Sequence, residues 1–266
     1  MFFQVNMKKT VAITTPSKSL IFKSFFLSLS IVLLFFLSIQ RHRNHQIITY
    51  PPPTAPSSSG DLRIRPGYTS YSAYIQHQLH KTLNPRLRKI WTTRDWDRKI
   101  DVFSNFFQDL KRKKLLRNNS KALCIGARMG QEVAALKRVG VLDAVGIDLV
   151  PSPPLVMEGD FHSQPFENQT FDFEFSNVFD HALYPWKFVG EIERTLRPGG
   201  VCVLHVALTR RGDKYSANDL YSVGPLMAMF RESELVHIRE VDGFGLDTEL
   251  VFRKKKESAV MIKIKE

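Results

Sequence analysis

A short glycine-containing loop followed by an acidic residue is the part of this 266-residue sequence most typical of a ligand site. Gly126 and Gly130 follow the apolar segment 122–125, and Asp148 ends a second apolar segment 22 residues after Gly126. Glycines let a backbone approach a ligand closely, and an acid at the end of the second strand can accept hydrogen bonds from ribose hydroxyls. The spacing therefore predicts a nucleoside site, although a plain turn would explain the loop alone equally well.

Arg128 distinguishes this loop from those that bind a pyrophosphate. It stands where the G-x-G-x-x-G pattern requires its second glycine, and the sequence contains no G-x-x-x-x-G-K-[ST] phosphate loop. A nucleoside without phosphate fits the loop better than a dinucleotide.

The elements that must position these residues follow the order of a doubly wound α/β fold. We predict strands over 122–125, 142–147, 171–177 and 201–208, helices over 131–139 and 186–196, and a terminal hairpin of 235–241 with 249–252. A third strand should end near Asp160, and Asn177 ends the fourth. Open α/β sheets bind ligands at the carboxyl ends of their strands, so both side chains are expected at the ligand edge.

Five segments occur in the order typical of one family: CIGARMGQE, VGIDL, GDFHSQPF, FDFEFSNVFDHALYP and EIERTLRPGG. On them the chain resembles the class I, Rossmann-like S-adenosylmethionine-dependent methyltransferases with a methyltransferase type 11 domain, in particular membrane-anchored plant members. The resemblance covers about residues 84–254 and implies a seven-stranded α/β sheet with flanking helices and S-adenosylmethionine as cofactor. It implies that the cofactor is bound by Gly126, Ala127, Arg128, Gly130, Asp148, Leu149, Asp160, Phe161 and Asn177.

Within that set, the resemblance gives Asp148 the ribose, Asp160 and Phe161 the adenine, and the loop the methionine end. Two features depart from the family pattern. Arg128 replaces the middle glycine of G-x-G-x-G, and it either pairs with the carboxylate of the cofactor or caps the loop from outside. Residues 151–154 (PSPP) replace the helix usually found between strands two and three, because prolines there cannot be helical.

His181 and Asp180 are the candidate catalytic residues, since both follow the fourth predicted strand at the ligand edge. An imidazole with an unperturbed pKa near 6.5 suits removal of a proton from a methyl acceptor. The alternatives are a packing or cofactor-shaping role for His181 and a helix N-cap for Asp180. Tyr184 and Trp186 either line an acceptor pocket or pack at a helix start, and 209–231 is the expected acceptor lid.

Glu174 and His205 are polar residues in two neighbouring strands that should be buried. A buried carboxylate needs a partner, so we predict that these two side chains contact each other in a structural role. The two cysteines, Cys124 and Cys202, are too few for a disulfide scaffold or a cysteine-built zinc site, and no metal is predicted.

The charge of the chain is unevenly distributed. Residues 1–117 hold 20 basic and five acidic side chains, a net charge of +15, whereas 118–266 hold 18 and 21, a net charge of −3. An acidic core does not favour nucleic acid as a partner. Within 84–117 an apolar stripe at helical spacing predicts a leading helix. The basic run 111–114 lies at the end of this helix. It is either a solvated face that complements the helix dipole or a contact for anionic lipid or substrate.

The N-terminal part reads as a membrane anchor and stem. Residues 24–39 carry no charge, which predicts a transmembrane signal anchor over 19–39 after a tail over 1–18. We predict a stem over 40–83 and a methyltransferase domain over 84–266. Within that domain, the leading helix covers 84–117 and the core covers 118–254. A cleaved signal peptide is the alternative, but no small-x-small cleavage site follows the span. Lysines before the span favour a cytosolic N-terminus and a domain in the lumen of the endoplasmic reticulum or Golgi.

The expected function is a membrane-anchored methyltransferase that acts on a small-molecule or saccharide acceptor. The alternative is an inactive module that binds S-adenosylmethionine and is tethered to a membrane. The presence of both Asp148 and Asp160 favours the enzyme. The sequence does not predict an oligomeric state.

Overall fold

The computed structural model describes residues 60–209 and 212–256. The predicted tail, the anchor over 19–39 and the first part of the stem lie outside these residues. Within the described part of the chain, no helix has the length and apolar character needed to cross a membrane.

A seven-stranded sheet forms the centre of the described fold, with strand order β4-β3-β2-β5-β6-β9-β8. Its strands are β2 (Ala122–Ile125), β3 (Ala144–Asp148), β4 (Val156–Glu158), β5 (Phe171–Ser176), β6 (Leu196–Val206), β8 (Ser233–Gly243) and β9 (Leu246–Lys254). The first five strands in this order are parallel, and β9 runs antiparallel to both β6 and β8. The seven-stranded α/β sheet predicted from the sequence is therefore confirmed.

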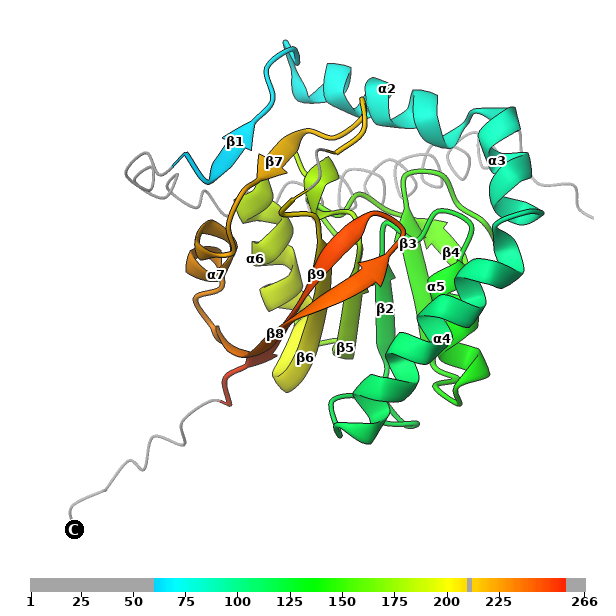
Figure 1. The fold of residues 1–266 in the computed structure, drawn as a ribbon, viewed down its shortest axis with the longest axis vertical. Helices are drawn as coiled ribbons and strands as arrows, with labels where there is room; N and C mark the ends of the chain where they lie inside the picture. The colour runs from blue at the N-terminus through cyan, green and yellow to red at the C-terminus, as the bar shows by residue number, and fades with distance from the viewer. Residues whose placement is uncertain (1–59, 210–211, 257–266) are drawn as a thin grey trace, which may run out of the picture. The chain divides into compact units, whose positions relative to one another are not determined.

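Helices cover both faces of this sheet (Figure 1). The helices α4 (Trp96–Arg112) and α5 (Gln131–Arg138) lie on one face, and α6 (Pro185–Thr195) and α7 (Gly224–Met229) on the other. The predicted stripe of the leading segment is the buried side of α4, where Phe103 and Phe107 are at most 1% exposed. Both faces of the sheet are thus apolar, as a covered parallel sheet requires.

The segment before α4 corrects two predictions. Residues 84–117 contain two helices, because α3 (Pro85–Thr92) begins after the Asn84 cap and ends at Thr92, before α4 starts at Trp96. The predicted stem is wrong beyond residue 60, since it contains β1 (Leu62–Ile64) and α2 (Tyr71–Thr82).

Local capping and tertiary pairing explain this ordered segment. The Ser70 side chain caps α2 by accepting a hydrogen bond from the Ala73 N–H at 3.1 Å. Strand β1 pairs antiparallel with β7 (Asn218–Leu220). The inner side of α2 is Tyr74, Gln78 and Thr82, all at most 8% exposed. Two of these three are polar, which is why an apolar pattern did not reveal the helix.

The predicted contact between Glu174 and His205 is wrong. Glu174 lies opposite Cys202 in the parallel pairing of β5 with β6, so His205, three residues further on, points to the other face of the sheet. Glu174 instead accepts a hydrogen bond from the Thr195 hydroxyl at 2.7 Å, and His205 Nε2 lies 3.0 Å from a carboxylate oxygen of Glu249. Each buried group has found a partner on its own face.

The basic run at the end of α4 is tied to the protein itself. The Lys111 ammonium donates to the Val139 carbonyl, while Arg112 and Lys113 pair with Asp109 at 3.1 and 2.9 Å. These contacts support the structural interpretation of the run over a surface for anionic partners.

Candidate cofactor and active site

A cavity of about 320 Å³ lies at the carboxyl ends of three neighbouring strands. Gly126 follows β2, Asp148 ends β3 and Asn177 follows β5, and all three line the cavity. The chain changes direction across the sheet between β2 and β5, so this is the topological switch point at which open α/β sheets bind ligands. Helices α2 and α4 and the β8–β9 hairpin also contribute to the walls.

The loop 126–130 and Asp148 form one structural unit. Gly126 has φ +71°, and a Cβ there would lie 2.4 Å from Val178 Cγ2; Gly130 has φ +92°, and a Cβ there would lie 2.7 Å from Leu155 Cβ. Both positions therefore exclude a side chain. The backbone N–H of Arg128 donates to Asp148 Oδ2 at 3.0 Å and fixes the acid against the loop.

Asp148 retains capacity for a ligand. The residue is 9% exposed, and its carboxylate accepts hydrogen bonds from the N–H groups of Arg128 and Val150 at 3.0 and 3.3 Å. Burial raises the pKa of Asp148. An ionised carboxylate can accept about four hydrogen bonds, so two places remain for ligand hydroxyls. Leu149 and Phe161, two other predicted cofactor residues, line the same cavity.

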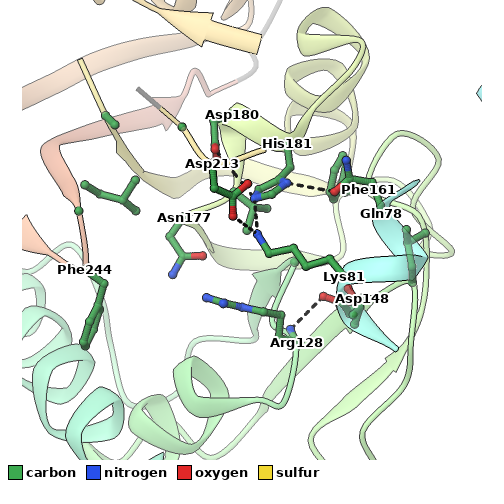
Figure 2. Close-up of a pocket in the computed structure, with 18 of the residues that line it drawn as sticks. Gln78, Lys81, Arg128, Asp148, Phe161, Asn177, Asp180, His181, Asp213 and Phe244 are labelled. Carbon is green, nitrogen blue, oxygen red and sulfur yellow. Dashed lines mark hydrogen bonds and ion pairs between the residues drawn. The ribbon is translucent and has the colours of Figure 1, made fainter. Parts of the chain in front are cut away.

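Arg128 adopts the left-handed backbone region at φ +47° and lines the cavity. Its guanidinium carbon lies 5.2 Å from the ring centroid of Trp91 in α3, a cation–π contact. It has no ion pair with any residue that the structure describes. Figure 2 shows Lys81, Arg128 and Asn177 projecting into the cavity between Asp148 at one end and Phe244 at the other.

Lys99 of α4 is a cavity residue that the sequence reasoning missed. The side chain lines the cavity although the residue is only 8% exposed, and its ammonium lies 5.0 Å from the ring centroid of Phe244. Burial lowers the pKa of Lys99 to about 8. Its position next to the buried stripe of α4, one residue before Ile100, is the signal that could have revealed it.

Asp160 lies apart from the cavity lining. Its carboxylate accepts a hydrogen bond from the Tyr71 hydroxyl of α2 and another from the His162 N–H at 2.8 Å. Burial would raise the pKa of Asp160, but the hydrogen bonds from His162 and Tyr71 lower it. Its predicted contact with adenine stays a prediction, and it would have to share the carboxylate with α2.

His181 is held at both ring nitrogens. Its Nδ1 lies 3.0 Å from Gln78 Oε1 and its Nε2 lies 3.2 Å from the Lys81 ammonium. Because an ammonium only donates, Nε2 accepts and Nδ1–H donates to Gln78. Burial lowers the pKa of His181. The lone pair that a general base needs is therefore already occupied in this structure.

Asp180 lies beside His181 in the short helix η1 (Phe179–His181), lines the cavity and accepts a hydrogen bond from the Ser216 hydroxyl. The alternative role of helix N-cap is wrong, since α6 begins after Tyr184. Tyr184 stacks on Tyr71 at 5.6 Å between ring centroids and does not line the cavity, and neither does Trp186.

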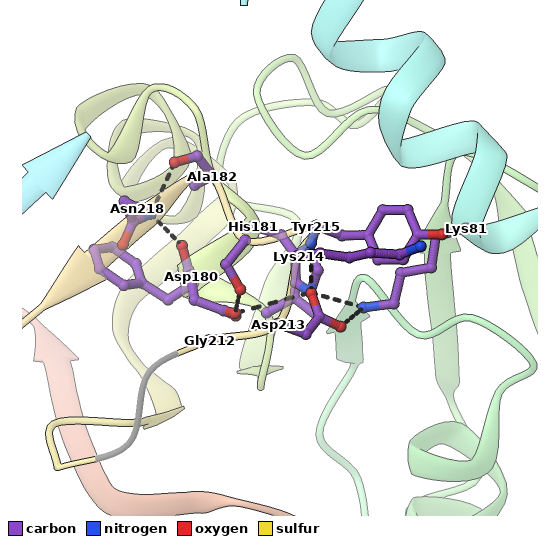
Figure 3. A network of polar contacts seen from close by, with 12 residues as sticks. Lys81, Asp180, His181, Ala182, Gly212, Asp213, Lys214, Tyr215 and Asn218 are labelled. Atoms are coloured by element: carbon purple, nitrogen blue, oxygen red, sulfur yellow. Dashed lines mark hydrogen bonds and ion pairs between the residues drawn. The ribbon is translucent and has the colours of Figure 1, made fainter. Parts of the chain in front are cut away.

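The predicted lid segment contributes to the cavity through Gly212 and Asp213. Figure 3 shows Lys81 reaching from α2 to Asp213, with 2.7 Å between Nζ and Oδ2. This ion pair connects α2 to the segment that follows β6. The polar chain Gln78–His181–Lys81–Asp213 thus lines one side of the cavity, and two of its members, Gln78 and Lys81, come from the segment predicted to be a stem.

Comparison with known proteins gives the same assignment as the geometry. Residues 123–204 match a family described as a methyltransferase domain. No curated protein matches the chain. Among solved structures, a Burkholderia thailandensis 1,6-didemethyltoxoflavin N1-methyltransferase with bound 1,6-didemethyltoxoflavin and S-adenosylhomocysteine is similar, with TM-score 0.56 and 15% identity over 73% of this chain and 95% of that chain. A Haloferax volcanii complex of the Trm112 methyltransferase activator with its proposed methyltransferase has a chain of similar fold, with TM-score 0.50 and 16% identity over 66% and 96% of the two chains.

The residues present fit the cofactor of such enzymes. S-adenosylmethionine carries ribose hydroxyls, for which Asp148 has free acceptor positions, and a carboxylate, for which Arg128 and Lys99 supply cations. The cavity holds no phosphate-binding loop, in agreement with a nucleoside ligand. Residues 123–204 therefore match a methyltransferase domain, and the residues that line the cavity fit S-adenosylmethionine as the ligand.

Proposed function

We propose that the cavity at the ends of β2, β3 and β5 is where this protein binds S-adenosylmethionine and transfers its methyl group to a small-molecule or saccharide acceptor. The observation that carries the proposal is Asp148, a buried acid at the topological switch point whose carboxylate lines the cavity and has acceptor capacity left. The bound cofactor supplies an electrophilic methyl group, so the protein has to align a nucleophile and, where necessary, remove its proton.

The geometry favours Asp180 over His181 as the group that receives the proton. Asp180 lines the cavity and its side chain is 26% exposed, so an acceptor hydroxyl or amine can approach it. His181 can act as a base only after the Lys81 ammonium leaves its Nε2. In the arrangement described, His181 instead positions Lys81 and Gln78 of α2 over the cavity.

A turnover assay tests this assignment. Purified full-length protein with methyl-labelled S-adenosylmethionine should transfer label to members of a panel of phenols, amines and neutral oligosaccharides. Asp180→Asn should lower kcat by about 100-fold or more, because general base catalysis contributes at least that much, and should leave the affinity for S-adenosylhomocysteine unchanged. His181→Gln should have a smaller effect on kcat. A wild-type protein that does not bind S-adenosylhomocysteine would overturn the proposed function.

We also propose that residues 19–39 anchor the protein in a membrane of the early secretory pathway with the domain in the lumen. The support is the apolar character of that segment and the lysines that precede it. Protease protection in sealed microsomes tests the orientation. The domain should survive protease until detergent is added, and degradation in intact vesicles would contradict a lumenal domain.

A further inference from the structure

We infer that a second, smaller cavity beside the cofactor cavity binds the methyl acceptor through one ring-sized group, and that Asn218 accepts a hydrogen bond from an O–H or N–H of this group. The second cavity has a volume of about 120 Å³ and is lined by the segment after β5, the end of β6 and β7. The inference rests on the proposed function. It narrows the acceptor to a small apolar ring that carries a hydrogen-bond donor besides the atom that is methylated.

The first argument is that the two cavities adjoin at the proposed base. Four residues line both of them: Asp180, Ala207, Gly212 and Leu246. A molecule in the second cavity therefore lies next to Asp180 and beside the space assigned to the cofactor. Methyl transfer requires this arrangement, because the acceptor atom has to meet the cofactor and the base at one place.

The second argument is that Asn218 is buried in the lining of the second cavity with half of its amide unused. The residue has no exposed surface, and its Nδ2 donates to the carbonyl oxygens of Phe179 and Ala182, each at 2.8 Å (Figure 3). Because carbonyl oxygens only accept, the amide cannot be reversed. Its Oδ1 has no hydrogen-bond partner among the residues that the structure describes. A buried oxygen without a partner is costly, so this atom is suited to accept from an O–H or N–H of a bound molecule.

Two other polar residues of the second cavity differ from Asn218. The Asp219 carboxylate is already bonded by two arginines, one in β1 and one just after it, at 2.8 and 2.6 Å. His205 Nδ1 also lacks a partner in the described part of the chain, but its ring packs against Phe106 on the α4 face of the sheet. Leu220 of the second cavity belongs to the core on the opposite face. Asn218 therefore combines complete burial with a free acceptor on the side of the cavity.

The third argument is the size and apolar character of the second cavity. An apolar protein cavity of about 150 Å³ takes up one benzene ring, whereas drug-sized ligands occupy pockets of about 300 Å³ or more. The second cavity, at about 120 Å³, has room for one ring but not for a saccharide chain. Phe179, Val206 and Leu220 in its lining are at most 6% exposed, so most hydroxyls of a sugar ring would find no partner there. An aromatic or other apolar ring with one donor fits both the volume and the lining.

Two probes of similar size that differ in one donor, phenol and fluorobenzene, test the inference. Their affinities are measured by NMR titration of the full-length protein in mild detergent, saturated with S-adenosylhomocysteine. Phenol should bind about 5- to 100-fold more tightly, because fluorobenzene leaves Asn218 Oδ1 unpaired. Methyl glucoside, an uncharged sugar ring, should bind more weakly than phenol.

A matched pair of variants locates the probe. Leu220→Phe fills the second cavity and should weaken phenol binding by about tenfold, because the ring could then enter only by overpacking. Leu226→Phe changes a similarly buried leucine that lines neither cavity, and it should leave the phenol affinity unchanged. Equal phenol affinities in these two variants would place the probe elsewhere and contradict the inference.

A further variant identifies the atom that accepts the hydrogen bond. Replacing Asn218 would also release the carbonyl of Phe179 in η1, so the neighbouring acceptor is removed instead. Asp180→Ala should retain the preference for phenol over fluorobenzene. Loss of the preference in this variant would mean that Asp180 accepts from the probe, and it would contradict the role of Asn218.

The outcomes separate the inference from the proposed function. If the wild type binds S-adenosylhomocysteine but binds the two benzene probes equally, binds neither, or prefers methyl glucoside, the inference is wrong while the cofactor site stands. If S-adenosylhomocysteine does not bind, both are wrong. Should Leu220→Phe fail to fold, the comparison of probes in the wild type and in Asp180→Ala still decides the inference.

Discussion

Two groups of buried and half-buried charges in this protein differ in their partners. In the hairpin cluster, Glu249 of β9 is fully buried and its carboxylate is bonded by His205, His237 and Arg239. In the cavity, Lys99 and Arg128 have no ion pair within the described chain. The acid of the hairpin cluster is paired in the folded protein, whereas the cavity cations contact only aromatic rings there and face a space that an anionic ligand could enter. The burial of a charge alone therefore does not indicate a ligand site. A charged side chain that lines a cavity without an ion-pair partner does indicate one.

The largest effect is expected in the hairpin cluster. Glu249→Gln removes the one negative charge that three donors share and should lower the free energy of unfolding by about 3 kcal/mol, as breaking a buried ion pair does. Urea unfolding of the full-length chain measures the loss. Glu240→Gln on the exposed side of β8 is the matched control and should change stability by less than about 0.5 kcal/mol. A Glu249 variant as stable as this control would contradict a structural role for the cluster.

Low pH should remove the stability that the ionised Glu249 carboxylate contributes. Burial would raise the pKa of Glu249, but hydrogen bonds from His205 and Arg239 lower it from 4.5 to about 2. A lowered folded-state pKa stabilises the protein above pH 4.5, and this stabilisation is lost as the pH falls through about 2. The gap in unfolding free energy between wild type and Glu249→Gln should shrink by about 3 kcal/mol between pH 5 and pH 2. A gap that is constant over this range would argue against the shift.

In the cavity, Asp148→Asn should lower the stability of the ligand-bound protein more than that of the free protein. Saturation with S-adenosylhomocysteine at about 100 times its dissociation constant should stabilise the wild type by about 2.7 kcal/mol. Asp148→Asn should lose most of this gain, because the amide replaces one of the two acceptor oxygens. Asp143→Asn, at the opposite end of the same strand and exposed, should keep the full gain. Equal thermal shifts for the two variants would remove Asp148 from the site.

The smallest effect is expected at Glu174, another fully buried glutamate. Burial raises the pKa of Glu174 to about 8, so at pH 7 this carboxyl is mostly protonated and resembles the amide of glutamine. Glu174→Gln keeps the hydrogen bond from Thr195 and should cost less than about 1 kcal/mol in the same urea experiment. A loss as large as that of Glu249→Gln would mean that Glu174 is ionised and paired.

Much of the fold could be predicted from local sequence patterns, because strands and helices of the core bury apolar faces. The strand ending at Asp148 and the turn at Gly126 are positioned by such patterns, so Gly126, Arg128, Asp148 and Asn177 were expected at one edge and all line the cavity. The pairing of Glu174 with His205 failed because the register between neighbouring strands decides which face a residue takes, and one sequence does not contain that register.

The missing part of the site comes from tertiary packing. Gln78 and Lys81 belong to α2, whose inner side is mostly polar, so the sequence has no apolar periodicity there that would predict a helix. The position of Lys99 beside the apolar stripe is a weak local signal, because its burial depends on Phe244 of the distant hairpin. Their partners lie at least 100 residues away in the chain, beyond the reach of local patterns.

The central claim, that the cavity cations are completed by the cofactor, is tested most directly by the pKa of Lys99, measured by NMR on protein with labelled lysine side chains. We expect a pKa of about 8 for Lys99 in the ligand-free protein. Saturation with S-adenosylhomocysteine should raise it toward the ordinary value of 10.5, because a carboxylate favours the charged ammonium. Saturation with 5′-methylthioadenosine, which lacks the amino acid end, should leave it unchanged. A pKa near 10.5 in the free protein, or one that does not move when S-adenosylhomocysteine binds, would contradict the account.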